Sequence, residues 1–274
     1  MKNFGIIRNS IKDPADETTR MISEHLSRRG AVVREVMTEQ DIIPEMEALL
    51  VLGGDGTMLR AAKLAVSHDL PMLGINLGTL GYLAEVNRDR ILPALDKLLR
   101  NEFTVEERMM LTGEVHHGRS LVCRETALND IVISREGAPR VILFKNYVNG
   151  EFLNVWQADA IIMSTATGST GYALSAGGPI ISPTASLIMM TPLAPHTLNA
   201  RSIIFPSTDE LMTEIGRGRT EMIERARVDF DGAGGYAVET GDTIVVSQSR
   251  KRARIIKIRS VSFLEVLRNK LSNN

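Results

Sequence analysis

Hydrophobic and polar positions follow two different periods in the first hundred residues. Short apolar runs of strand length alternate with longer stretches in which apolar residues recur every three or four positions. The runs predict strands at 4–8, 31–36, 48–52 and 71–75, and the stretches predict helices within 13–30, 57–68 and 91–101. Strands that alternate with helices favour a Rossmann-like parallel sheet, whose ligands lie beyond the carboxyl ends of the strands.

The first predicted helix carries signals for both of its ends. Asp13 suits the N-cap, and Pro14 suits the first helical position because its missing N–H would be unpaired there in any case. Gly30 is a suitable stop, since glycine is common just after the last helical turn.

The pattern changes after about residue 102, where short runs follow one another with turns between them. Asn149-Gly150 separates two apolar-rich runs, which is a strong hairpin signal. Leu264, Leu267 and Leu271 share one face of a helix predicted at 263–271. We therefore expect an α/β fold followed by a β fold: a parallel α/β domain (1–101), a β-rich, sandwich-like domain (102–260) and a terminal helix (261–274) that packs back on the first domain.

Composition narrows the class of protein. The formal net charge is −1, which gives no electrostatic case for nucleic acid or an anionic membrane as partner. The one cysteine excludes a disulfide within the chain. Neither a signal peptide nor an apolar run of membrane-spanning length is recognisable. The sequence thus predicts a cytoplasmic, soluble protein.

The first stretch with candidate chemistry is GGDGT (53–57), which follows the strand at 48–52. Glycines allow a ligand to approach the backbone, and the following helix offers unpaired N–H groups to a polyphosphate. Asp55 in such a loop is suited to act as a general base towards a hydroxyl that attacks a phosphate. The alternative is a plain strand-to-helix turn with Asp55 as a cap.

Two further stretches follow predicted strands. In GINLGTLGYLAE (74–85), Asn76 is placed to hydrogen-bond the backbone of the neighbouring loop. The alternative is a glycine-rich crossover that only turns the chain. In TALNDIVIS (126–134), Asn129 and Asp130 are adjacent. Because neighbouring strand residues face opposite ways, both meet one ligand only if the strand is distorted or ends there. An exposed strand start is the alternative.

The segment 157–180 is the richest in hydroxyls and glycines, and its flanks are apolar. Asp159 opens a buried run, and TATGSTGYALS (165–175) follows it. Such a stretch suits a polar small molecule with several hydroxyls, such as a ribose. By contrast, DFDGAGG (229–235) lacks the ligand pattern of a calcium loop and is interpreted as a turn.

Five motifs in this order resemble the NAD kinase family: GGDGTML (53–59), GINLGTLGYLAE (74–85), LND (128–130), TGSTGYALSAGGPI (167–180) and PHTLNARSI (195–203). GGDGT also occurs in diacylglycerol, sphingosine and 6-phosphofructo kinases, and the 167–180 segment narrows the resemblance. It implies transfer of the terminal phosphoryl group of ATP to the 2′-hydroxyl of the adenosine ribose of NAD, giving NADP.

The resemblance also implies roles for individual residues. Asp55 would be the general base, and Asn129 with Asp130 would hold the adenine–ribose side of NAD. Asp159 would bind the nicotinamide end, and Tyr172 would stack on a ring. The remaining residues expected to contact the nucleotides are Gly53, Gly54, Gly56, Thr57, Arg60, Arg140, Gln157, Thr170, Gly171, Ala173, Leu174, Ser175 and Ala194.

The chain departs from the family at two positions. The family more often has Asn-Glu at 129–130 and Ala at 171. Asp130 keeps the acid with a shorter reach, and Gly171 removes a methyl group without removing a polar contact.

The resemblance further implies Mg²⁺ (or another divalent cation) carried on ATP and a homodimer or homotetramer. Two other classes stay open from the sequence. One is a lipid or sugar kinase that shares GGDGT and ignores NAD, and the other is a dinucleotide sensor that binds NAD without turnover.

Overall fold

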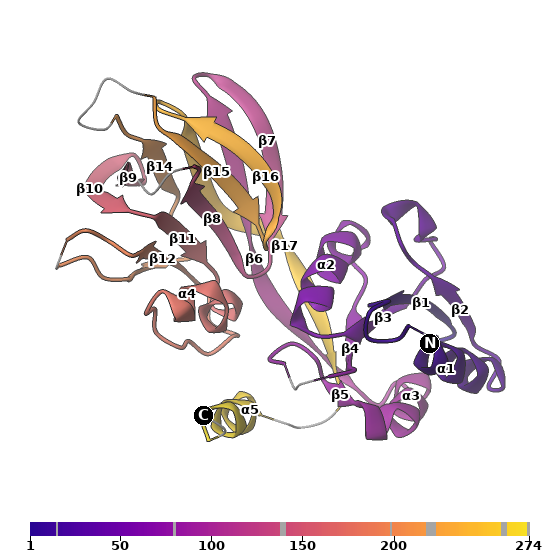
Figure 1. Ribbon diagram of the computed structural model, residues 1–274. Helices are drawn as coiled ribbons and strands as arrows, with labels where there is room; N and C mark the ends of the chain where they lie inside the picture. Colours follow the sequence, from indigo (N-terminus) through magenta and orange to yellow (C-terminus); the bar gives the residue numbers. More distant parts are fainter. Residues whose placement is uncertain are drawn as a thin grey trace. The chain divides into compact units, whose positions relative to one another are not determined.

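The computed structural model describes residues 1–14, 16–78, 81–137, 141–197, 199–217, 223–258 and 262–272. The chain forms two compact units, Met1–Arg108 with Arg252–Asn274 and Met109–Lys251. Figure 1 shows the helices and strands of both units. The domain limits expected at residues 101 and 260 stay predictions.

The first unit alternates strands and helices. Its described elements are β1 (Asn3–Arg8), α1 (Glu17–Ser27), β2 (Val32–Glu35), the 3₁₀ helix η1 (Glu39–Asp41), β3 (Ala48–Gly53), α2 (Asp55–Ala65), the 3₁₀ helix η2 (Val66–His68), β4 (Met72–Asn76), β5 (Val86–Asn87), the 3₁₀ helix η3 (Arg88–Arg90), α3 (Ile91–Leu99) and α5 (Phe263–Leu271). β2, β1, β3 and β4 pair in this order, and all are parallel.

Alternate side chains of β3 serve the two faces of this sheet. Leu50 and Leu52 pack in one apolar cluster with Ile22 of α1 and Leu95 of α3. On the other face, α2 packs against Gly74 of β4, because a Cβ on Gly74 would contact the Met58 sulfur of that helix. Helices therefore cover both faces, as the strand–helix alternation predicted.

The second unit is rich in β structure. Its described elements are β6 (Thr104–His117), β7 (Ser120–Ala127), β8 (Asp130–Arg135), β9 (Ile142–Val148), β10 (Glu151–Ala158), β11 (Ala160–Ser164), the 3₁₀ helix η4 (Thr167–Thr170), α4 (Tyr172–Ser175), β12 (Leu187–Leu193), β13 (Ile203–Pro206), β14 (Leu211–Ile215), β15 (Arg225–Phe230), β16 (Ala233–Glu239) and β17 (Thr243–Lys257). β6 and β17 begin or end in the first unit.

Two sheets enclose the apolar core of the second unit. One contains β10, β9, β14 and β17 in this order, and β6 extends it through β17. The other is antiparallel, in the order β13-β12-β11-β8-β15-β16. Phe144 of the first sheet and Phe230 of the second belong to one fully buried cluster. The expected sandwich-like, β-rich fold is confirmed.

The turn predicted at Asn149-Gly150 joins β9 to β10, and both residues have positive φ, at 52° and 81°. This geometry suits a two-residue hairpin. The start of the first helix was predicted wrongly, because α1 begins at Glu17 and not at Pro14. Asp13 still accepts the N–H groups of Thr18 and Thr19, at 3.1 and 3.0 Å, from a turn that precedes the helix.

The terminal helix α5 contacts the first unit, as expected. The Phe263 ring lies 6.4 Å from the Tyr82 ring between centroids, and the Lys270 ammonium lies 4.8 Å from the same Tyr82 centroid. Leu264 and Leu271 remain exposed, so the leucine face is not the face that makes this contact.

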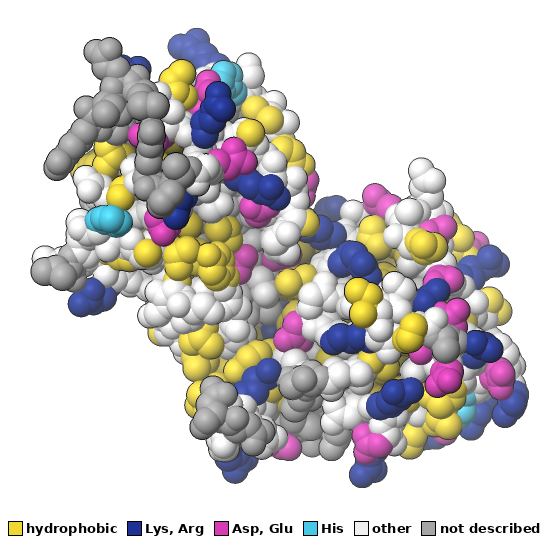
Figure 2. Space-filling view, in the orientation of Figure 1, with side chains coloured by type: hydrophobic (Ala, Val, Ile, Leu, Met, Phe, Trp, Pro, Cys, Tyr) yellow, Lys and Arg dark blue, Asp and Glu magenta, His cyan; other side chains and the backbone are white. Residues whose placement is uncertain are grey.

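Charged side chains of both signs are interspersed on the surface over α1–α3, as Figure 2 shows. This distribution agrees with the near-zero net charge. In the described part of the chain, every helix is too short or too polar to cross a bilayer.

Candidate active site

The first candidate site lies at the carboxyl end of β3. Gly53 ends the strand, Gly54 is the N-cap of α2, and Asp55 is the first helical residue. A Cβ at Gly53 would overlap the side chain of Thr57, which is buried. The absence of a side chain at Gly53 therefore allows the first turn of α2 to close on the strand.

The Asp55 carboxylate is held by the loop that follows β4. Tyr82 N–H donates to Oδ2 at 2.8 Å, and Leu83 N–H donates to Oδ1 at 3.0 Å. A Cβ at Gly81 would overlap Oδ1, so only glycine permits this approach. An ionised carboxylate has about four lone-pair sites. The carboxylate is thus fixed in orientation and retains capacity for another partner.

The loop after β4 is itself ordered by Asn76. The Asn76 amide donates to the carbonyl of Gly78 at 2.9 Å and accepts the Gly78 N–H at 3.0 Å. The bond predicted from the sequence is therefore present. Burial, and secondarily the Asp55 charge, raises the pKa of the Tyr82 phenol, so that phenol is neutral near Asp55 at physiological pH.

A pocket of about 300 Å³ opens beside Asp55, lined by Asn9, Lys12, Gly54, Asp55, Gly56, Thr57 and Arg60. The Lys12 Nζ lies 3.2 Å from the positions that a Cβ would occupy on Gly54 and on Gly78. Among the described residues, Lys12 has no ion pair. A cationic side chain thus extends over two glycine-rich loops at the pocket.

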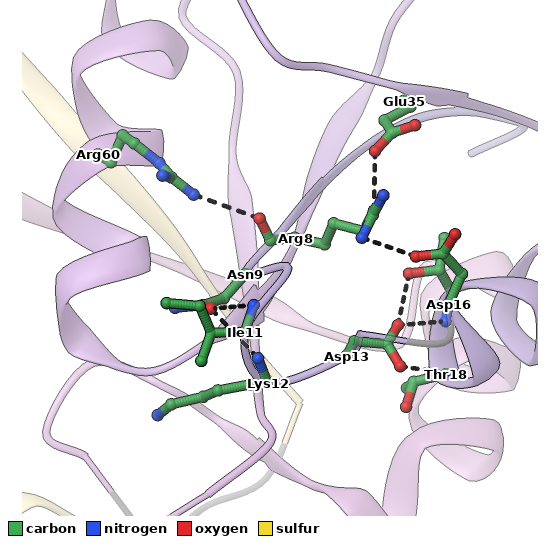
Figure 3. A network of polar contacts seen from close by, with 10 residues as sticks. Arg8, Asn9, Ile11, Lys12, Asp13, Asp16, Thr18, Glu35 and Arg60 are labelled. Atoms are coloured by element: carbon green, nitrogen blue, oxygen red, sulfur yellow. Dashed lines mark hydrogen bonds and ion pairs between the residues drawn. The ribbon is translucent and has the colours of Figure 1, made fainter.

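Lys12 and Asn9 were not identified from the sequence. Asn9 follows β1 directly, and its Oδ1 accepts the N–H groups of Ile11 and Lys12, at 3.0 and 3.3 Å (Figure 3). The available signal was their position just after the first strand, because parallel strands bring their carboxyl ends to one edge of a sheet.

Arg60 lies one turn into α2 and lines the same pocket. Its guanidinium donates to the carbonyl of Arg8 at 3.2 Å, while the guanidinium of Arg8 is engaged by Asp16 and Glu35 (Figure 3). Arg60 uses one of its five N–H donors in this bond, and within the described ranges its other donors remain available to an anion.

The second candidate site belongs to the second unit. β7 ends at Ala127 and β8 begins at Asp130, so Asn129 lies in the turn between them. A Cβ on Gly171 would lie 3.2 Å from Asn129 Nδ2 and 3.6 Å from Asp130 Oδ2. Because the strand pattern is interrupted at Asn129, both adjacent side chains reach the same point. The buried Asn129 Oδ1 has no hydrogen-bond partner in the described structure.

Asp130 is an acid of this site whose ionisation is strongly perturbed. Its side chain is buried, and this burial, with a smaller effect from the charge of Asp231, raises its pKa from 3.8 to about 7. Ionisation of Asp130 is costly only in the folded protein. The contribution of its protonated carboxyl to the free energy of unfolding is therefore complete below about pH 4. That contribution is lost as the pH rises through about 7.

We therefore expect Asp130→Asn to match the wild type in stability at pH 4 and to exceed it at pH 8. The upper limit is roughly 4 kcal/mol, at ~1.4 kcal/mol per pKa unit. Urea unfolding at the two pH values measures the difference. A stability difference that does not change with pH would contradict the assignment.

The hydroxyls of the segment 165–170 are largely engaged within the protein. Thr165 Oγ1 donates to the carbonyl of Leu128 at 2.6 Å, and Ser169 Oγ donates to that of Ala166 at 2.7 Å. Thr170 Oγ1 donates to the carbonyl of Thr167 at 3.2 Å. These hydroxyls shape the turn after β11, and they leave fewer free donors for a ribose than the composition alone indicated.

Helix α4 offers a different set of groups. Tyr172, Leu174 and Ser175 are exposed. Ala173 is fully buried in an apolar cluster with Met189, so its side chain faces the protein interior. Ala173 therefore has only backbone atoms to offer a ligand.

Gln157, Asp159 and Ala194 form a separate group at the start of β11. Asp159 N–H donates to the backbone carbonyl of Leu193, the residue before Ala194. The backbone carbonyl of Gln157 accepts the N–H of His196. Asp159 also pairs with Arg135 at 2.8 Å. The segment 165–175 follows the other end of β11, which is five residues long, or roughly 16 Å. Arg140, also expected at the site, lies outside the described residues.

Comparisons with known proteins identify relatives of this chain. Residues 34–103 match a family model described as the ATP-NAD kinase N-terminal domain, and residues 128–258 match the ATP-NAD kinase C-terminal domain. An NAD kinase of Lachnospira eligens is 44% identical, with 99% of this chain and 100% of that protein covered. An NAD kinase of Agathobacter rectalis is 39% identical over 100% and 99% of the two chains.

Solved structures show the same fold. The yeast NADH kinase complexed with NADH has a TM-score of 0.86 at 23% identity, covering 100% of this chain and 88% of that one. An NAD kinase from Archaeoglobus fulgidus in complex with ATP has a TM-score of 0.80 at 22% identity, covering 99% of each chain.

These similarities define the class of protein as a kinase, an enzyme that transfers a phosphoryl group. The chain belongs to the NAD kinase family. It transfers the terminal phosphoryl group of ATP to the 2′-hydroxyl of the adenosine ribose of NAD, which gives NADP. The resemblance in the sequence is confirmed, and the full-length relatives do not favour a lipid or sugar kinase.

Proposed function

We propose that Asp55 is the general base of this reaction and accepts the proton of the NAD 2′-hydroxyl as that oxygen attacks the terminal phosphorus of ATP. The main support for this role is the position of the Asp55 carboxylate. Two backbone N–H groups fix it at the edge of a pocket that Lys12 and Arg60 also line. Phosphoryl transfer requires mainly positioning and neutralisation of charge, and these groups supply both.

The glycines and Thr57 at the start of α2 are proposed to hold the ATP phosphates. The first N–H groups of a helix and its positive dipole end favour an anion. Gly56 lies at the pocket, and a Cβ there would meet no atom within 4 Å, so the loop has room for a ligand. Gly53, Gly54 and Arg60 complete this proposed phosphate site.

No group of three His, Cys, Asp or Glu side chains within the described ranges is placed to hold a metal. The proposed divalent cation, such as Mg²⁺, would be held mainly by the ATP phosphates. When bound, such a cation neutralises phosphate charge. Lys12 and Arg60 would add positive charge from the protein.

The NAD contacts are proposed as two groups. Asn129, Asp130, Gly171 and the segment Thr170–Ser175 would hold the adenine–ribose side, with Tyr172 exposed for stacking. Gln157, Asp159 and Ala194 would bind the nicotinamide end, and Arg140 is proposed as a further contact. Because β11 separates the two groups, a homodimer or homotetramer would let different copies supply them to one NAD molecule. We also propose a cytoplasmic location.

Replacing Lys12 tests the phosphate pocket. We expect Lys12→Met to raise KM for ATP roughly 10-fold or more, because a charge-assisted hydrogen bond contributes about 1.5–3 kcal/mol. KM for NAD should change little. Steady-state kinetics of NADP formation separates the two constants.

Lys97 on α3 provides the matched control, since it is exposed and does not line the pocket. Lys97→Met should keep wild-type kinetics. If Lys12→Met shows wild-type KM for ATP and wild-type kcat, Lys12 has no part in phosphate binding.

The function itself is tested by incubating the purified chain with ATP, Mg²⁺ and NAD and measuring NADP. Calorimetric binding of NAD without NADP formation would instead support a dinucleotide sensor.

A further inference from the structure

The turn before β8 is held by a carboxylate from a distant hairpin. Asp231 lies at the tip between β15 and β16, where it has a φ of 52° and is followed by Gly232, whose φ is 73°. From this tip, Asp231 Oδ2 accepts the N–H of Leu128 at 2.8 Å. Its Oδ1 accepts the N–H groups of Asn129 and Asp130, at 2.7 and 3.2 Å. One side chain thus binds three successive backbone donors.

We propose that Asp231 is a positioning residue for NAD recognition: its carboxylate sets the turn at 128–130, and this turn directs the side chains of Asn129 and Asp130 to one point beside Gly171. The inference rests on the proposed function, in which Asn129 and Asp130 hold the adenine–ribose side of NAD. Asp231 acts through them.

The backbone bonds around the turn show why a carboxylate is needed. Asp231 N–H donates to the carbonyl of Asp130 at 3.0 Å, which fixes the hairpin tip against the start of β8. On the other side, Thr165 N–H donates to the carbonyl of Asn129 at 2.9 Å. A continuous strand would point residues 129 and 130 to opposite faces. Three N–H groups that converge on one anion hold the chain in a different conformation at this point.

The packing of the turn leaves little freedom to compensate for a lost carboxylate. A Cβ on Gly168 would overlap the backbone of Asn129, so the turn and η4 are in close contact. A shift of the turn would therefore move the Asn129 amide, whose buried Oδ1 lacks a partner in the described structure. An unpaired buried amide oxygen is suited to accept a hydrogen bond from a ribose hydroxyl.

Asp231→Asn tests the proposal. Asparagine keeps one acceptor oxygen and places an NH₂ donor where the other oxygen was. At least one of the three backbone N–H groups therefore loses its acceptor. We expect KM and Kd for NAD to rise roughly 10- to 100-fold, as expected when a charged hydrogen-bond acceptor is lost and the reacting groups are displaced. KM for ATP should stay at the wild-type value. A purely structural role would lower the active fraction and leave both KM values unchanged.

Asp229→Asn is the matched control. Asp229 lies two residues earlier on β15, and its carboxylate pairs with Arg227 at 3.0 Å instead of with the turn. This variant should keep the wild-type KM for NAD. Melting temperatures of both variants check that they fold.

Asp231→Glu keeps the charge and moves it by one methylene, so it decides the matter if Asp231→Asn does not fold. Its KM for NAD should lie between those of the wild type and Asp231→Asn, or be raised several-fold if that variant is lost. A wild-type KM for NAD in either folded Asp231 variant would overturn the proposal. Failure of the proposed function is distinguishable, because the wild type itself would then form no NADP, and calorimetric NAD binding would still compare the variants.

Discussion

Replacing Asp55 with asparagine should lower kcat for NADP formation by roughly 10²- to 10⁴-fold, the usual contribution of a positioned general base. The amide keeps the size of the carboxylate and one acceptor oxygen, so the bond from Tyr82 or that from Leu83 survives. It cannot accept the proton of the 2′-hydroxyl. KM values for ATP and NAD should change much less than kcat.

Asp69→Asn is a suitable control for this substitution. The Asp69 side chain is 81% exposed, so its pairing with Arg254 contributes little, and asparagine tolerates its left-handed backbone at φ 53°. Steady-state assays of NADP should show wild-type kcat for this variant. Wild-type kcat in a folded Asp55→Asn variant would remove Asp55 from the mechanism.

Adding one methyl group at Gly81 should be nearly as damaging. A Cβ at this position would overlap Oδ1 of Asp55, so either the carboxylate or the 81–83 loop must move. Displacement of a reacting group by about 1 Å costs on the order of 10²-fold in rate. We expect Gly81→Ala to lower kcat by about that factor, with KM for ATP within a few-fold of the wild type.

Kinetics of purified Gly81→Ala, measured alongside its melting temperature, checks this expectation. A variant that melts like the wild type and has lost kcat supports the role of the loop in holding Asp55. Wild-type kcat would show that the Asp55 orientation seen in the structure is not required for the reaction.

Local patterns predicted the elements that position the site. The apolar run at 48–52 and the helical spacing after it predicted β3 and α2. The position of Asp55 at a strand end therefore followed from the spacing of apolar residues alone. The Asn149-Gly150 turn was equally predictable, because its backbone requires two positive φ values that few other residues tolerate. The bond between Asn76 and Gly78 spans two residues and is likewise local.

The contacts that complete the site were not predictable from local patterns, because they join distant segments. Asp231 was interpreted as part of a turn, which it is, but its bonds to residues about a hundred positions earlier depend on how β15 pairs with β8. Lys12 shows the same limit, since its position over Gly54 and Gly78 depends on the order of parallel strands.

Side-chain composition also gave an incomplete account of the segment 165–175. The sequence favoured its hydroxyls as ribose contacts, whereas Thr165 and Ser169 are buried and donate to backbone carbonyls. A buried hydroxyl must be paired. In a turn close to a strand end, backbone carbonyls lie within reach of such a hydroxyl even when no ligand is bound. Burial decides between these uses, and burial was not visible in the composition.

The proposed base is the Asp55 carboxylate in the orientation given by the 81–83 loop. The most direct measurement is kcat for NADP formation in Asp55→Asn, Gly81→Ala and the double variant. If Gly81 matters because it leaves room for the Asp55 carboxylate, the double variant should have the same kcat as Asp55→Asn, because effects of residues that act as a unit do not add. A further loss of about 10²-fold in the double variant, equal to that of Gly81→Ala alone, would show that Gly81 acts independently of the Asp55 carboxylate and would contradict its role as the oriented base.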